Sequence, residues 1–106
     1  MATKDDIGDA YNTIHNAINA ALAKTSGSNA VMNLVAESNA ARSAYTSAMN
    51  ASLNASDPVL QNLTDQLKQA AKDLAETNQD IQDEQKYIGY IGSAVGFLAK
   101  IAALVG

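Results

Sequence analysis

The stretch "YIGYIGSAVGFLAKIAALVG", Tyr87 to Gly106, decides the fold expected for this chain, because it is apolar and carries a single charge at Lys100. The residues directly before it, "NQDIQDEQK", are almost all polar. A helix that is apolar on every side is covered either by protein or by lipid. Any architecture for the chain must therefore explain what covers this segment.

A seven-residue repeat leads into that stretch. From Leu60 to Val105, apolar residues recur at alternating intervals of three and four positions. Such a repeat favours one long helix with a coiled-coil seam, although an ordinary bundle helix has the same spacing. The repeat therefore predicts that the helix continues past Tyr87 without a loop. The predicted seam, which would contact a partner or another copy, consists of Leu60, Leu63, Leu67, Leu74, Ile81, Ile88, Ile91, Val95 and Leu98.

Two shorter helices are expected before this one, over residues 4–24 and 29–54. Apolar residues at helical spacing mark one face of each, and small residues dominate the second. Gly27 is expected to take a left-handed backbone conformation between them. Asp57 is expected to cap the third helix, with Pro58 in its first turn.

The resulting fold class is all-α: a helical hairpin or three-helix bundle over residues 1–86, followed by an apolar helical tail over residues 87–106. At the rise of an α-helix, the three helices would span roughly 30, 40 and 70 Å. The first two helices cannot reach the tail if the third is straight. The apolar tail would then be covered by another copy of the chain, by a partner or by a membrane. If the tail folds back at its glycines, the rest of the chain would cover it.

Length and composition keep a membrane among these alternatives. Residues 87–105 would form roughly 28 Å of helix, against about 30 Å of hydrocarbon. The large apolar residues favour insertion by about 2–5 kcal/mol in total, and Lys100 offsets most of this. The small-residue spacing suits close helix packing in lipid or in a protein assembly. The residues predicted to form this close-packing or membrane face are Gly89, Gly92, Gly96, Tyr87, Tyr90 and Phe97.

Composition excludes several classes of function. The net charge of −4 argues against nucleic acid as a partner, because phosphates require a basic surface. The chain has no Cys, and no secretory signal peptide is recognisable at the start of the sequence. The lone His15 is expected at a helix edge, and the cluster Asp5, Asp6 and Asp9 suits the positive end of a helix dipole. We therefore expect no enzyme activity, no metal site and no cofactor.

The segment "SDPVLQNLTDQL", Ser56 to Leu67, resembles in architecture the hairpin turn of small secreted needle and rod subunits of bacterial secretion systems. The resemblance covers the hairpin only, since a second turn proline is absent and the tail is rich in glycine. It implies a bacterial structural subunit, exported without a cleavable signal peptide, that assembles with itself or with a helical partner. The alternatives are a membrane-active or tail-anchored protein, such as a pore component that inserts residues 87–105, and a small binding protein, such as an immunity protein or chaperone.

Overall fold

The structure of the protein is a computed structural model that describes residues 4–24, 27–51, 56–77 and 84–105. Within these ranges the chain forms helices and no strands. The four helices are α1 (Lys4–Lys24), α2 (Ser28–Asn50), α3 (Pro58–Thr77) and α4 (Glu84–Val105). The predicted all-α fold class is therefore confirmed.

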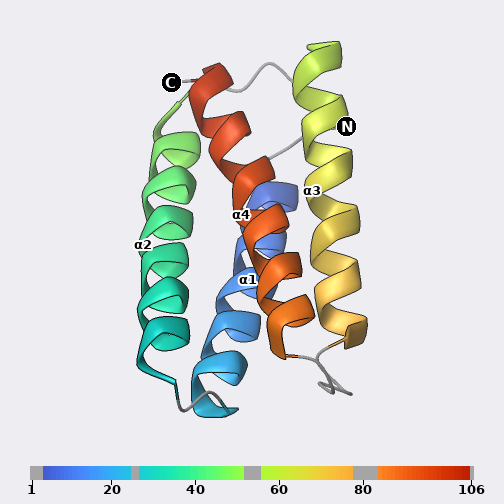
Figure 1. Ribbon diagram of the computed structural model, residues 1–106. Coiled ribbons are helices and arrows are strands. Elements are labelled where there is room, and N and C mark those ends of the chain that lie inside the picture. Colours follow the sequence, from blue (N-terminus) through green and yellow to red (C-terminus); the bar gives the residue numbers. More distant parts are fainter. Residues whose placement is uncertain (1–3, 25–26, 52–55, 78–83, 106) are drawn as a thin grey trace.

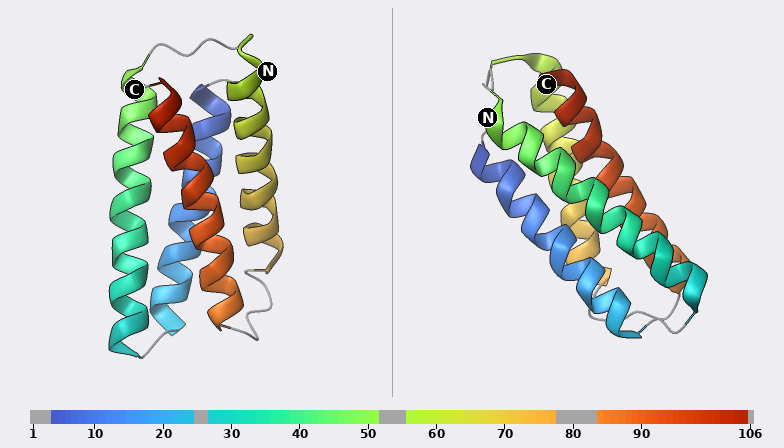
Figure 2. Two further views of the ribbon diagram at one scale, coloured as in Figure 1. Left: turned by 45° about the horizontal axis from the view of Figure 1, so that its top comes forward. Right: turned by 90° about the vertical axis from the view of Figure 1, so that its left-hand side faces the viewer.

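The helices lie side by side in an elongated bundle of 42 × 23 × 17 Å (Figure 1). Helices α1 and α3 run in one direction, and α2 and α4 run in the other (Figures 1 and 2). Helix α1 contacts the other three helices, and α4 does the same. In the described residues α2 and α3 make no contact, so they occupy opposite corners of the bundle and the chain crosses diagonally between them.

The prediction of one continuous third helix is wrong. The chain reverses direction between Thr77 and Glu84, and α4 packs antiparallel to α3. The tail is therefore a fourth helix of the bundle and not an extension of a three-helix fold. The physical reason is that the repeat places one apolar stripe on each helix. Two antiparallel helices of one chain can bury such stripes against each other just as well as two chains can.

The helix ends agree with the sequence in part. The first helix has the predicted bounds, and the second ends at Asn50, before the predicted end at residue 54. The backbone N–H of Val59 donates to Asp57 Oδ1 at 2.9 Å, so Asp57 caps α3 as predicted. Gly27 lies at the predicted break between α1 and α2, but its φ of −80° and ψ of 132° are extended backbone and not the left-handed conformation open to glycine.

The core of the bundle combines a few large aliphatic side chains with many alanines. Helix α1 contributes three isoleucines, whereas α2 contributes Leu34 together with alanines. Because alanine removes little apolar surface from water, the contacts of α2 stabilise the bundle less than those of α1. The other buried residues of this core come from α3 and α4: Leu60, Leu67, Ala71, Leu74, Tyr87, Ile91, Ala94, Val95, Leu98 and Ile101.

Candidate functional site

The outward face of α4 is the most unusual surface of the molecule. The segment Lys86–Val105 is long and apolar enough to cross a membrane, with a mean hydropathy of 1.8. Only 28% of its apolar window is buried in the bundle, whereas a core helix of a soluble protein would be mostly buried. Leu104, near its end, is 41% exposed. Three helices thus cover one side of α4 and leave the other side at the surface.

The predicted seam lies largely inside the molecule's own core. Six of its members are buried: Leu60, Leu67, Leu74, Ile91, Val95 and Leu98. Leu63 and Ile88 are partly buried against the same core. Ile81 lies outside the described residues. The buried seam residues therefore contact other helices of the same chain and present little surface to a second one.

Tyr87 is separated from the other residues predicted to form the close-packing or membrane face. Its side chain is 1% exposed, and its hydroxyl donates to the carbonyl oxygen of Ala17 in α1 at 3.4 Å. Burial raises the pKa of the Tyr87 phenol above its ordinary value. Tyr87 thus fixes the beginning of α4 against α1 and does not face outward.

The glycines of α4 lie on or near the outward side. A Cβ atom added to Gly89 or Gly96 would meet nothing within 4 Å. At Gly92 it would lie 3.8 Å from Oε1 of Glu37, which is ordinary contact. The bundle itself therefore does not require glycine at these three positions for close packing.

A groove of about 340 Å³ runs between α3 and α4. Tyr90, Ser93 and Phe97 form the wall contributed by α4. The wall contributed by α3 consists of Gln66, Gln69, Ala70 and Asp73. The groove thus combines two aromatic rings, spaced two helical turns apart, with a polar opposite wall.

Both aromatic rings of this groove are paired with lysines of α4. Nζ of Lys86 lies 5.9 Å from the centre of the Tyr90 ring. Nζ of Lys100 lies 5.5 Å from the centre of the Phe97 ring. These distances are those of cation–π interactions. A stripe of two lysines and two aromatic residues therefore follows the outward face of α4.

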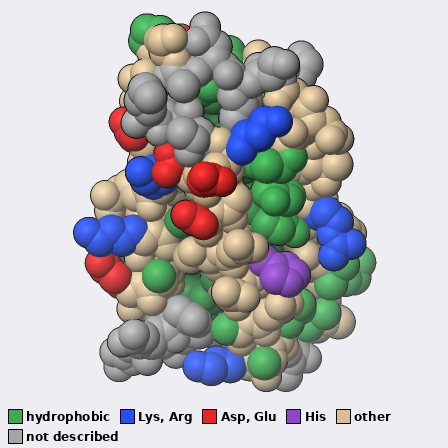
Figure 3. All heavy atoms as spheres, turned by 180° about the vertical axis from the view of Figure 1, so that it is seen from behind, with side chains coloured by type: hydrophobic (Ala, Val, Ile, Leu, Met, Phe, Trp, Pro, Cys, Tyr) green, Lys and Arg blue, Asp and Glu red, His purple; other side chains and the backbone are tan. Residues whose placement is uncertain are grey.

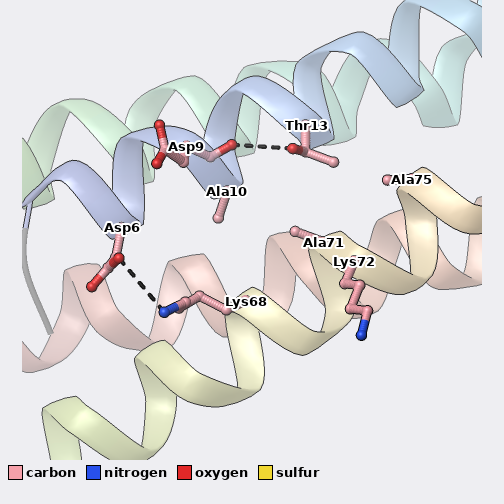
Figure 4. Close-up of a pocket in the computed structure, with 8 residues that line it drawn as sticks. All are labelled: Asp6, Asp9, Ala10, Thr13, Lys68, Ala71, Lys72 and Ala75. Carbon is pink, nitrogen blue, oxygen red and sulfur yellow. Dashed lines mark hydrogen bonds and ion pairs between the residues drawn. The ribbon is translucent and has the colours of Figure 1, made fainter. Parts of the chain in front are cut away.

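A second groove, of about 220 Å³, lies between the parallel helices α1 and α3 (Figure 4). Its floor consists of alanines, and Asp6 and Asp9 stand on the α1 side opposite Lys68 on the α3 side. Nζ of Lys68 lies 3.6 Å from Oδ1 of Asp6. The Thr13 hydroxyl in the same groove donates to the carbonyl oxygen of Asp9 at 3.2 Å. The polar groups of this groove largely interact with one another.

The side of the bundle opposite α4 carries both acidic and basic side chains (Figure 3). Carboxylates gather there on one side of a hydrophobic strip, and His15 lies beside that strip. The rings of Tyr11 and Tyr45 stack with centroids 4.3 Å apart, and His15 stacks on Tyr11 at 5.9 Å. One nitrogen of His15, Nε2, also lies 3.2 Å from Nδ2 of Asn19. His15 is thus at a helix edge and bridges neighbouring side chains.

Sequence reasoning missed both grooves and the stack between α1 and α2. Each requires knowing which helices are neighbours, and the periodicity of one helix carries no such information. The signal available for the α3–α4 groove was the spacing of Lys86, Tyr90, Phe97 and Lys100 on one face of a helix. In the described residues, no three His, Asp or Glu side chains are grouped as metal ligands would be.

Comparisons of the chain with known protein families, with curated proteins and with solved structures find no match.

Proposed function

We propose that this chain is a non-enzymatic helical protein that binds lipid bilayers by inserting α4. The observation that carries the proposal is the partial cover of α4: a helix apolar enough by composition to cross a bilayer lies at the surface of the bundle, with 28% of its window buried. Its exposed positions are occupied by small residues and lysine, together with Leu104. Its 22 residues would span about 33 Å, which matches the hydrocarbon thickness. The carboxylates on the opposite side would remain in water.

Release of α4 would expose its own large buried side chains, such as Tyr87, Leu98 and Ile101, but the contribution of α2 to its packing is thin. Helix α2, one of the neighbours of α4, buries Leu34 and otherwise only alanines. Alanine contacts contribute little apolar burial, so separating these helices costs less than separating helices packed by large side chains. Insertion would repay part of this cost by transferring the isoleucines, leucines and valines of α4 into hydrocarbon.

The two charged residues of Lys86–Val105 have positions compatible with insertion. Lys86 lies in the first turn of α4, at the water interface of an inserted helix. Lys100 lies about 7 Å from the end of the helix at Val105, so its flexible side chain can reach the interface. A lysine held at the bilayer centre would cost about 2.5–3.5 kcal/mol, and the position near the helix end reduces that cost.

The chain contains no tryptophan, so one introduced tryptophan can report on the insertion of α4. In Phe97→Trp the reporter lies on α4 at a half-buried site that lines the α3–α4 groove, and in Met32→Trp it lies on α2 at a site that is 68% exposed. With vesicles of phosphatidylcholine, we expect the fluorescence of the first variant to shift to shorter wavelength and to be quenched by brominated acyl chains. The second variant should show neither effect. An unchanged spectrum of Phe97→Trp would contradict the proposal.

A matched pair of charge substitutions tests the surface itself. Ala99 and Ala40 are both exposed helical alanines, on α4 and α2 respectively, and neither lines the α3–α4 groove. Ala99→Asp should strongly reduce vesicle binding, because a carboxylate on α4 would have to enter hydrocarbon. Ala40→Asp should bind like the unmodified protein. Circular dichroism of both variants checks that the bundle still forms.

A second candidate function is a binding or assembly module that uses the same face of α4. The open space around Gly89 and Gly96 supports this alternative, because two copies could bring these faces close together. Because α4 folds back onto the bundle and does not extend α3, self-assembly would have to use the outer surface of α4. Light scattering without lipid distinguishes the two: a defined oligomer that Gly96→Leu dissociates would favour assembly.

A further inference from the structure

We propose that the groove between α3 and α4 binds a quaternary ammonium group, of the kind carried by the choline headgroup of phosphatidylcholine. The groove offers aromatic rings from α4, a carboxylate from α3 and a volume of about 340 Å³. Aromatic rings with a nearby carboxylate form the type of site that recognises quaternary ammonium ions. This inference deepens the proposed function, on which its lipid part rests, by naming the headgroup that the bundle recognises.

The spacing of the two rings fits a cation between them. Tyr90 and Phe97 are seven residues apart on one face of α4, which corresponds to roughly 10 Å along the helix. A cation bound in the groove would therefore have one aromatic residue on either side of it along α4. Ala70 and Ser93, which line the groove between the rings, leave room because their side chains are small.

Each ring already has a lysine ammonium group over it, that of Lys86 over Tyr90 and that of Lys100 over Phe97. A bound cation would have to displace these like-charged groups or lie between the rings on the side away from them. A trimethylammonium group carries the same charge but is larger and less strongly hydrated, so it loses less on leaving water for an aromatic site. The groove is therefore suited to a quaternary ion in preference to a primary ammonium.

The α3 wall supplies the negative charge. Gln69 Nε2 donates to Oδ1 of Asp73 at 3.0 Å, which holds that carboxylate in place. Because α3 and α4 are antiparallel, Asp73 lies toward the Tyr90 end of the groove and Gln66 toward the Phe97 end. A quaternary ammonium has no N–H to donate, so it needs nearby negative charge and not a directed hydrogen bond.

The charge of the protein agrees with a zwitterionic lipid. At a net charge of −4, the chain as a whole is repelled by an anionic bilayer. A phosphatidylcholine surface has no net charge and presents its trimethylammonium groups outermost. Because the groove exists only while α3 and α4 are packed together, headgroup binding would precede insertion and would bring the outward side of α4 to the bilayer.

The soluble part of the test uses tetramethylammonium chloride and the ring resonances of Phe97, which are identifiable because the chain has one Phe. We expect a saturable shift of these resonances that an equal concentration of ammonium chloride does not produce. Asp73→Asn should weaken binding about fivefold, the effect of losing one weak ionic contact. Asp65→Asn, at an exposed site of the same helix outside the groove, should bind as before. No shift with tetramethylammonium would overturn the proposal.

The lipid part compares vesicles of phosphatidylcholine with vesicles in which half of the lipid is phosphatidylethanolamine, which has the same net charge but a primary ammonium. We expect tighter binding to the first, and Asp73→Asn should remove that preference. Equal binding to both, with tetramethylammonium still binding, would overturn the lipid assignment and leave a site for a soluble cation. Binding to neither vesicle would contradict the proposed function. The shift of the Phe97 resonances with tetramethylammonium would still show whether the groove binds a quaternary ammonium ion.

Discussion

At the scale of single residues, Tyr87 connects ionisation to stability. Its phenol is buried at the α1–α4 contact, and burial raises its pKa. In the unfolded chain the phenol loses its proton near its ordinary pKa of about 10, whereas the folded protein retains the proton to higher pH. The unfolded state therefore binds fewer protons in that window, and stability falls as pH rises above about 10.

Tyr87→Phe should remove this component of the pH dependence. At pH 8 the substitution should change the free energy of unfolding by about 1 kcal/mol or less, because one long hydrogen bond is lost. Between pH 8 and pH 10.5 the variant should lose less stability than the unmodified protein. Urea unfolding followed by circular dichroism at both pH values measures the difference. An equal loss in the two proteins would mean that Tyr87 does not couple folding to pH.

Thr64 is a weak point in the core. It is 1% exposed, and its hydroxyl has no hydrogen-bond partner in the described part of the chain. Thr64→Val keeps the shape and removes the buried polar atom, so it should raise the free energy of unfolding by about 1 kcal/mol. Thr13→Val is the control, because the Thr13 hydroxyl donates to a backbone carbonyl at the surface. A loss of stability in Thr64→Val would indicate that the hydroxyl is bonded in solution.

At the scale of the helices, α2 depends on one large side chain. Leu34 is fully buried, and its buried companions in α2 are alanines. Leu34→Ala should lower the free energy of unfolding by about 2–4 kcal/mol, a large share of the stability of a small domain. Val35→Ala, at an adjacent residue that is 46% exposed, should change it by less than about 0.5 kcal/mol. Similar effects of the two substitutions would show that α2 packs differently.

The sequence predicted individual helices better than their arrangement. The isoleucine stripe defined α1, and the Asp-Pro pair defined the start of α3, because these signals are local. The reversal before α4 could not be predicted in the same way. The spacing of three and four residues indicates that one face of a helix is buried, but it does not indicate which element covers that face. Likewise, the position of Tyr87 as a core residue and the pairing of α3 with α4 depend on contacts between distant parts of the chain. The expected division at residues 86 and 87 stays a prediction.

At the scale of the whole molecule, the proposed function links bundle stability to membrane binding. If α4 must leave its neighbours before it enters lipid, a weaker bundle should insert faster. In the Phe97→Trp background, Leu34→Ala should speed the fluorescence change on mixing with phosphatidylcholine vesicles. Thr64→Val should slow it. Equal rates in all three proteins would mean that α4 enters the bilayer without first separating from the bundle.

The diagonal path between α2 and α3 has a consequence for the order of folding. The antiparallel pairs α1–α2 and α3–α4 join neighbours in sequence, whereas the pairs α1–α3, α2–α4 and α1–α4 join segments far apart along the chain. Closing the larger loops costs more chain entropy, so the two hairpins should form early and dock late. Substitutions that weaken a hairpin should then slow refolding. Ala40→Gly, at an exposed site of α2, lowers the helix propensity of one arm of the α1–α2 hairpin and should do so in a stopped-flow experiment. Docking, and with it the burial of α4, would be the last step that the chain completes.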